Sequence, residues 1–195
     1  MGRYLGELGT DTLGVTIPEY KVGRVSWTAA QAIAPGACHA AITSNGSTTV
    51  TTTTAFTQPV VARNLVITPG GTTASVKAAS ITVNGTNLEG QVISEAFAFA
   101  ENATAATTGA KAFKTVTSVV IPAQDGADAT FTVTTGAKLG LPVKMASNQV
   151  FMAKFGTTHD SALPTVAFSS TALESNTATF ATTLDGTACE LYLVL

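Results

Sequence analysis

The amino-acid sequence predicts an all-β protein: an antiparallel β-sandwich or jelly-roll-like domain with an extended N-terminal arm. Threonine accounts for 35 of the 195 residues, and much of it alternates with apolar residues, as in residues 80–84 and 130–134. β-Branched residues suit a pleated strand, and strict alternation directs one set of side chains inward and the other outward. Short runs of this kind, separated by Gly, Pro, Asn and Asp, favour a sandwich or jelly roll.

The outward positions of these runs carry hydroxyl groups where most proteins carry charges. Charged residues make up 11% of the chain, and its formal net charge is −2. A hydrated but nearly uncharged surface suits close packing against other protein surfaces, so we expect a structural or binding protein. The Lys and Arg residues are scattered along the chain, which argues against a nucleic-acid partner because phosphate binding requires a basic patch.

Two further patterns concern the location of the protein. No apolar run approaches the ~18 residues that a membrane-spanning helix requires, so we expect no membrane partner. The N-terminus lacks the basic and then apolar order of a secretory signal. We therefore expect the chain to fold in the cytoplasm.

Residues 1–23 differ from the rest of the chain because glycines interrupt many large apolar residues. Neither a helical nor a strand period persists there. We expect an extended arm that docks in grooves of a partner, since several anchors together can offset the ordering entropy. The predicted partner-binding residues are Tyr4, Leu5, Leu8, Leu13, Ile17 and Tyr20. The alternative is an irregular first strand that packs on the chain's own core.

Residues 24–195 form the predicted β-sandwich domain, with a further sub-boundary expected near 143–149. Its strands are expected in succession at 25–30, 38–44, 48–56, 60–68, 76–83, 92–99, 113–121, 129–135, 150–155, 164–169, 177–184 and 187–194. Each run is rich in β-branched or aromatic residues and ends at turn-forming residues. A short helix is expected near 171–175.

Turn signals predict how some of these strands connect. Asn45-Gly46 and Asp185-Gly186 predict hairpins, because Asn, Asp and Gly tolerate the positive φ that tight hairpin turns require. Residues 138–142 predict a tight turn whose two leucines cap one end of the sandwich. The two hairpin signals predict pairing between strands that are neighbours in the sequence. Residues 76–83 and 92–99 are expected to pair as well, linked by residues 84–91.

Several large or reactive residues are candidates for the core. Phe97 and Phe113 are expected to fill it, whereas Trp27 is either a core anchor or a contact for a partner. Two cysteines do not make a disulfide framework. We expect Cys38 and Cys189 to be small apolar strand residues, with a long-range bridge or a redox pair as the alternative.

Residues with the chemistry for catalysis or metal binding do not form a usable pattern. His159-Asp160-Ser161 contains the residue types of a catalytic triad, but consecutive loop residues cannot align three side chains along one proton path. Cys38 and His39 are adjacent in a predicted strand and point to opposite faces, which argues against a zinc site. Asp125 and Asp128 could contribute to a calcium-binding loop. We predict no catalytic, cofactor-binding or metal-binding residues, and a protein that is not an enzyme.

Four segments in the middle of the chain resemble a known group of proteins. They are RNLVITPGG (63–71), ITVNGTNLEGQVISE (81–95), KAFKTVTSV (111–119) and GAKLGLP (136–142), and LDGT follows at 184–187. In this order the segments resemble tailed-bacteriophage virion structural proteins of all-β character, several of which look like capsid decoration, or cement, proteins. The resemblance covers roughly residues 58–195 and is strongest over 63–142.

This resemblance implies a virion protein that is made in the host cytoplasm and lies on the surface of the phage head. A decoration protein of this kind binds the head as a homotrimer and stabilises the lattice of the major capsid protein. One alternative is a structural protein of the tail or baseplate. Another is a carbohydrate- or host-binding module displayed on the virion.

Overall fold

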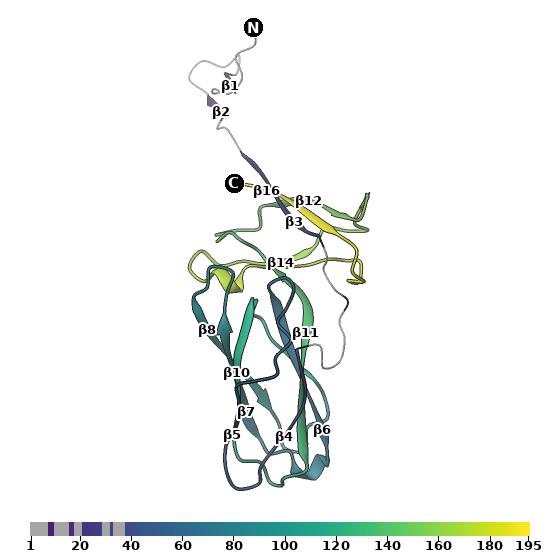
Figure 1. Cartoon of the computed structure of the whole chain (residues 1–195). Coiled ribbons are helices and arrows are strands. Elements are labelled where there is room, and N and C mark those ends of the chain that lie inside the picture. Colours follow the sequence, from purple (N-terminus) through teal and green to yellow (C-terminus); the bar gives the residue numbers. More distant parts are fainter. Residues whose placement is uncertain (1–7, 10–15, 18–20, 29–31, 33–37) are drawn as a thin grey trace.

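The structure, a computed structural model, describes residues 8–9, 16–17, 21–28, 32 and 38–195 of the chain. The described residues form antiparallel sheets and two short 3-10 turns, so the predicted all-β class is confirmed. Two of these sheets pack face to face, as in a β-sandwich. Figure 1 shows this sandwich in the lower half of the molecule and a smaller group of strands at its upper end.

The larger sandwich consists of a four-stranded sheet and most of a six-stranded sheet. The four-stranded sheet has the order β5 (Val50–Thr52), β10 (Thr115–Ile121), β7 (Ala79–Thr86) and β8 (Val92–Phe99). The six-stranded sheet has the order β14 (Thr165–Ala167), β15 (Thr177–Thr179), β11 (Ala129–Gly140), β6 (Arg63–Gly71) and β9 (Thr107–Thr108), and β4 (His39–Thr43) also pairs with β11. The 3-10 turn η1 (Thr73–Ser75) connects β6 to β7.

A third sheet forms a smaller C-terminal module. Its order is β13 (Thr158–His159), β12 (Val150–Phe155), β16 (Cys189–Val194) and β3 (Val22–Trp27). We use the name C-terminal module for this sheet together with β14, β15, η2 (Leu173–Ser175) and the last residues of β11. The turn η2 confirms the short helix expected near residues 171–175.

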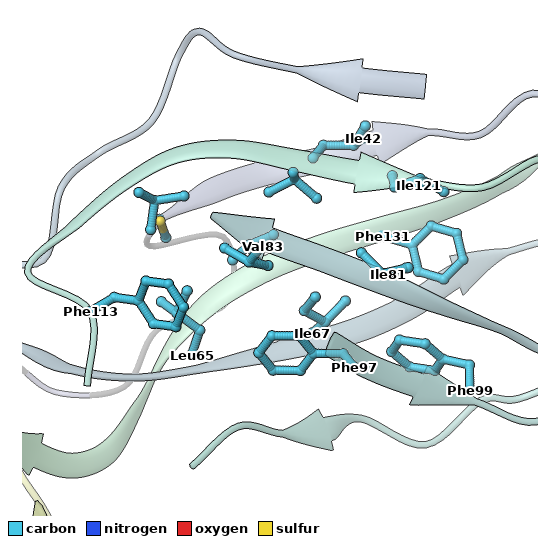
Figure 2. Close-up of a cluster of buried hydrophobic side chains, with 14 of the residues drawn as sticks. Ile42, Leu65, Ile67, Ile81, Val83, Phe97, Phe99, Phe113, Ile121 and Phe131 are labelled. Carbon is cyan, nitrogen blue, oxygen red and sulfur yellow. The ribbon is translucent and has the colours of Figure 1, made fainter. Parts of the chain in front are cut away.

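The core of the larger sandwich lies between its two sheets, because period-two alternation directs the apolar side chains of both sheets inward. Figure 2 shows Ile81, Val83 and Phe97 of one sheet facing Phe131 of the other. The rings of Phe99 and Phe131 lie 5.7 Å apart between their centroids. Phe97 and Phe113 are 1% and 0% exposed, which confirms their predicted place in the core.

The C-terminal module has a separate hydrophobic cluster. Trp27 of β3 is 6% exposed and packs edge-on against Phe180, with ring centroids 5.8 Å apart. Trp27 is therefore a core anchor. Cys189 belongs to this cluster and Cys38 to that of the larger sandwich, and both thiols are buried and free. Both cysteines are therefore small buried residues, as predicted, and they do not form the disulfide bridge that was the alternative.

Strand β11 connects the two cores. Phe131 and Val133 in its first half belong to the core of the larger sandwich, whereas Leu139 near its end belongs to the core of the C-terminal module. Figure 1 shows β11 running along the sandwich toward the smaller module. The second core thus begins at Leu139, before the sub-boundary expected near residues 143–149. It also includes residues of β3, a strand that begins at Val22, inside the segment 1–23 that was expected to be the arm.

The tight turn predicted at residues 138–142 is wrong, because β11 continues as a strand to Gly140. The glycine that suggested a turn serves close packing instead. A Cβ atom at Gly140 would lie 2.8 Å from the Cβ of Ala112 and 3.2 Å from that of Ala62. Glycine inside a strand often marks such a close approach. The two leucines of this segment were expected to cap one end of the sandwich, and Leu139 and Leu141 are indeed fully buried at this end.

Both hairpins predicted from Asn-Gly and Asp-Gly are also wrong. The strands on either side of Asn45-Gly46 separate, since β4 pairs with β11 and β5 pairs with β10. The strands around Asp185-Gly186 separate in the same way: β15 pairs with β11 and β14, and β16 pairs with β12 and β3. These turns reverse the chain locally, but the strands that follow them join a different sheet.

Candidate interaction surfaces

The predicted partner-binding residues of the arm are only partly covered by the structure. Tyr4, Leu5, Leu13 and Tyr20 lie outside the described residues. Leu8 and Ile17 lie opposite one another in a short antiparallel pairing between β1 (Leu8–Gly9) and β2 (Thr16–Ile17). The pairing brings these two positions of the arm together, and the partner contacts of all six residues stay a prediction.

The outer face of the four-stranded sheet is a broad uncharged surface, which we call the hydroxyl face. Its positions alternate with the core residues of Figure 2 and point away from them. They are Thr51, Ser80, Thr82, Asn84, Thr86, Val92, Ser94, Ala96, Ala98, Thr115, Ser118 and Val120. All of them are exposed or half-buried. The sequence-based expectation of outward hydroxyl groups is therefore confirmed for this sheet.

Charge is absent from the hydroxyl face because the four strands contain a single charged residue, which points elsewhere. Glu95 lies opposite Val83, a core position. Its carboxylate accepts hydrogen bonds from the backbone amides of Ala110 (2.6 Å) and Lys111 (3.3 Å). Glu95 thus fastens the segment after β9 to the lateral edge of the sandwich and leaves the face neutral.

Polar groups of the hydroxyl face bond to one another across the strands. The hydroxyl groups of Thr86 and Thr115 lie 2.7 Å apart. The Asn84 side-chain amide donates to the Ser118 hydroxyl at 2.9 Å. The Thr117 hydroxyl donates to the Asn84 carbonyl at 3.1 Å. Such cross-strand pairs stabilise the sheet and set its register.

The opposite face of the larger sandwich has the same character. Its outward positions on β4, β6, β9 and β11 include Thr43, Val66, Thr68, Gly70, Thr108, Thr130, Thr132 and Thr134. The charged residues of these strands, Arg63 and Lys138, lie toward the C-terminal module. Both broad faces of the larger sandwich are therefore uncharged.

The sheet of the C-terminal module differs, because charged and aromatic side chains cover its outer face. Lys154 lies opposite Glu190, and its Nζ atom is 5.9 Å from the centroid of the Tyr192 ring. The Tyr192 hydroxyl donates to the Glu190 carboxylate at 2.7 Å, and Arg24 pairs with the same carboxylate at 3.5 Å. This charged ladder is an ordinary solvated surface.

Two shallow hollows lie on the C-terminal module and at its junction with the larger sandwich. The junction hollow, about 270 Å³, is lined by Val25, Ser26, Trp27, Val60, Val61, Ala62, Leu88, Lys114, Gly140 and Pro142. The terminal hollow, about 370 Å³, is lined by Phe151, Met152, Ala153, His159, Asp160, Ala162 and Leu163. Both linings contain exposed apolar residues, with Leu163 59% exposed and Val60 52% exposed, beside polar residues such as Lys114 and Asp160. The sequence did not reveal these hollows, because their walls come from distant segments.

The segment His159-Asp160-Ser161 lies at the terminal hollow, and the carboxylate of Asp160 has a structural role. Asp160 accepts hydrogen bonds from the Thr182 hydroxyl (2.6 Å) and from the backbone amides of Ala181 (2.8 Å) and Ser161 (2.9 Å). Burial alone raises the pKa of Asp160, but these hydrogen bonds outweigh it and hold the pKa below its ordinary value. The carboxylate therefore stays ionised and clamps the loop after β15.

Other groups considered for chemistry have structural partners. His39 packs against the ring of Phe56, with centroids 5.0 Å apart. Burial raises the pKa of the Cys38 thiol to about 11, so this thiol is protonated and unreactive at neutral pH. Asp125 lies 3.9 Å from the ammonium group of Lys77. Among the described residues, no three His, Cys, Asp or Glu side chains gather closely enough to hold a metal ion.

Arg63 is a buried charge at the junction of the two modules. Its side chain is inside the protein, and its Nε donates to the Gly136 carbonyl at 2.7 Å. Burial lowers the pKa of Arg63 to about 10, because the low-polarity surroundings disfavour the charged form. The neighbouring Asn64 side chain bonds to the Gly109 carbonyl and to the Lys138 amide. This polar network ties β6 to β11 where β11 leaves the larger sandwich.

Comparisons with protein-family models, with curated proteins and with solved structures found no match to this chain. Within the described part of the chain, no helix has both the length and the apolar character needed to cross a membrane.

Proposed function

We propose that this chain is a structural protein of a tailed-phage virion that decorates the outer surface of the head. In this role it binds the major capsid protein, as a homotrimer, and stabilises the capsid lattice. The observation that supports the proposal best is the pair of broad uncharged β faces, because such faces suit packing in a crowded protein lattice. The order of the four segments between residues 63 and 142 supports the phage assignment.

The mechanism is additive binding. A single small contact gives a modest affinity, but an oligomer that touches several capsid subunits gains about 10²–10⁴-fold through effective concentration. The apolar residues of the N-terminal arm, such as Leu5 and Leu13, supply additional anchors of about 1.5–3 kcal/mol each where they are fully buried. Together these contacts resist the outward pressure of the packaged genome without any catalytic step.

Deletion of residues 1–20 tests the role of the arm. We expect the shortened chain to bind expanded phage heads less completely and to protect them less well against heat. The matched control replaces Thr10 and Thr12 with Ser, which keeps the length and the apolar anchors of the arm. Undiminished occupancy and unchanged heat resistance after the deletion contradict the role of the arm.

The copy number per particle tests the location on the head. A head protein is expected in a fixed, high ratio to the major capsid protein, whereas a tail or baseplate protein is present in few copies. Quantitative mass spectrometry of purified particles separates these two assignments. Absence of the chain from purified particles overturns the proposed function as a whole.

Display of a carbohydrate-binding module is less well supported. Stacking on sugars requires exposed aromatic rings; among the described residues Trp27 is in the core, whereas Phe151 and Phe168 are 48% and 47% exposed but have no polar group that could bond a sugar hydroxyl. Saturable binding on a glycan array is the result that favours this alternative.

A further inference from the structure

One carboxylate at the junction of the two modules is shared by a lysine and an asparagine. Glu174 belongs to η2 of the C-terminal module, and its side chain is 13% exposed. Its Oε1 lies 4.0 Å from the Nζ of Lys111, in the segment between β9 and β10. Its Oε2 accepts a hydrogen bond from the Nδ2 of Asn87 at 3.4 Å. The carboxylate thus brings together an amine and an amide from separate segments of the larger sandwich.

Backbone amides hold the side-chain carbonyl of this asparagine. Asn87 lies in the loop between β7 and β8 and is 1% exposed. Its Oδ1 accepts hydrogen bonds from the amides of Glu89 and Gln91, each at 3.0 Å, and its Nδ2 also donates to the Gln91 side chain at 3.0 Å. Two N–H donors of this kind form an oxyanion hole, which stabilises the charge that a carbonyl oxygen gains when a nucleophile adds to its carbon. The Asn87 amide is therefore arranged as an electrophile.

The amine is confined beside this amide. The backbone next to Lys111 is fixed to η2, because the Ala112 amide donates to the Glu174 backbone carbonyl at 2.7 Å. The Lys111 side chain is 35% exposed, and its Nζ donates to the Ser94 carbonyl at 2.9 Å. Holding the amine at the carboxylate that also contacts Asn87 turns the meeting of two reactive groups into a step within one molecule, which lowers its entropic cost.

We propose that Lys111 and Asn87 form an isopeptide bond within the folded chain, with Glu174 as the proton carrier. The Lys111 side chain turns from the Ser94 carbonyl toward Asn87, and its Nζ gives a proton to Glu174 and attacks the Asn87 Cγ. The bond between Cγ and Nδ2 then breaks, and the amide nitrogen leaves as ammonium. Of the three protons of the lysine ammonium group, one stays on the new amide nitrogen and two pass through the Glu174 carboxylate to the departing nitrogen. No group is oxidised or reduced.

The isopeptide bond links the β7–β8 loop to the segment that precedes β10, beside η2 of the C-terminal module. It closes a loop over residues 87–111 and constrains the unfolded chain, as a disulfide does. Unlike a disulfide, it needs no oxidising surroundings to form. This inference does not depend on the proposed function, because the reaction takes place once within a single chain and no partner takes part.

The intact mass of the purified full chain tests the proposal. We expect the folded chain to be lighter than its sequence by one ammonia. Digestion after glutamate, at Glu89, Glu95 and Glu101, separates Asn87 from Lys111 in the sequence. We therefore expect two peptides joined as one branched species. A folded chain that keeps its full sequence mass after prolonged incubation overturns the proposal.

The branched peptide distinguishes this bond from another way of losing ammonia. The backbone amide of a glycine can attack the side chain of the asparagine before it and form a cyclic imide, and the chain contains Asn45-Gly46 and Asn84-Gly85. A cyclic imide joins no distant residues, so digestion yields only linear peptides. Loss of ammonia without the branched species overturns the proposal.

Two variants assign the roles of the reacting groups. Lys111→Arg keeps a positive charge beside Glu174 but removes the nucleophilic amine, so this variant should keep its full mass. Glu174→Gln should also keep its full mass over the period in which the unmodified chain reacts, because proton transfer by a positioned side chain contributes about 10²–10⁴-fold to a rate. Loss of ammonia with the branched species at an unchanged rate in Glu174→Gln overturns the role of this carboxylate.

The matched control is Lys138→Arg, at a lysine whose Nζ donates to the Gly109 carbonyl at 3.1 Å. This variant should lose ammonia like the unmodified chain, and a full mass for Lys138→Arg contradicts the assignment to Lys111. Circular dichroism checks that each variant folds. If Glu174→Gln does not fold, the mass of the unmodified chain and that of Lys111→Arg still decide whether the bond forms.

Discussion

The larger sandwich and the C-terminal module are both antiparallel β structures, but they present different surfaces to their surroundings. The larger sandwich has neutral faces on which polar groups such as Asn84 and Ser118 bond to one another. The C-terminal module has an outer sheet face with an ion pair between Arg24 and Glu190. The difference shows that the few charged residues of the chain are not distributed evenly over its surface. Charge is concentrated at the ends and at the junction, and the broad faces of the sandwich are left free for contact with protein.

The largest effect is expected from breaking the core of the C-terminal module. Trp27→Ala should lower the free energy of unfolding by about 3–5 kcal/mol, because a large buried ring is lost and a cavity remains. Since β11 belongs to both cores, we expect one cooperative unfolding transition in urea. Circular dichroism measures this transition in every variant, and Trp fluorescence measures it in the unmodified chain, which contains Trp27. Two separate transitions would show that the modules unfold independently. Trp27→Phe, which keeps an aromatic ring, is the milder control.

A smaller effect is expected where β11 passes from one module to the other. Gly140→Ala should lower the free energy of unfolding by about 1–3 kcal/mol, because overpacking forces neighbouring atoms to shift. The new Cβ would lie 2.8 Å from the Cβ of Ala112. Ala98→Ser, at an exposed position of β8, is the control and should be nearly neutral. Equal stabilities of the two variants would remove the packing argument for Gly140.

Next in size is the coupling between Asn84 and Ser118 on the hydroxyl face. A double-mutant cycle with Asn84→Ala and Ser118→Ala should give a coupling free energy of about 0.5–1.5 kcal/mol, typical of a neutral hydrogen bond. The coupling should be the same at low and at high salt. A coupling near zero would mean that these groups bond mainly to water and not to one another.

The smallest effect is expected on the charged ladder. Arg24→Ala should change the free energy of unfolding by about 0–1 kcal/mol, because the Arg24 side chain is 60% exposed and water screens its ion pair with Glu190. Unlike the Asn84–Ser118 coupling, this effect should shrink as sodium chloride is added. An effect of Arg24→Ala that salt leaves unchanged would contradict the contrast between the two surfaces.

Much of the local structure could be predicted from the sequence. The strands expected at 92–99 and 150–155 agree with β8 and β12. Alternation in the run 92–99 shows which side chains are buried, because a strand turns each successive residue to the opposite face. For the same reason the outward threonines and the buried Phe97 could be assigned without a structure. The run 150–155 lacks such alternation, and there Phe151 is 48% exposed while Ala153 is buried.

The pairing of strands could be predicted only in part. The expected pair of 76–83 with 92–99 agrees with β7 and β8, but the two hairpins expected from Asn-Gly and Asp-Gly do not form. Asp185-Gly186 has the residues of a hairpin turn, and Gly186 does adopt a positive φ of 99°. The strands beside it nevertheless pair with β11 and with β12, whose residues lie far away in the sequence. A turn residue determines how the chain bends locally. The choice of hydrogen-bond partner depends on which sheets bury the most apolar surface together.

The sequence by itself determined the all-β class, the inward and outward positions of most strands and the scarcity of charge, because these depend on residue type and on a period of two. Only the tertiary structure decided that there are two cores, that β11 joins them and that the neutral positions of four strands merge into one face. That face exists because β5, β10, β7 and β8 align their outward residues in register. Register is set by long-range packing and not by any one strand.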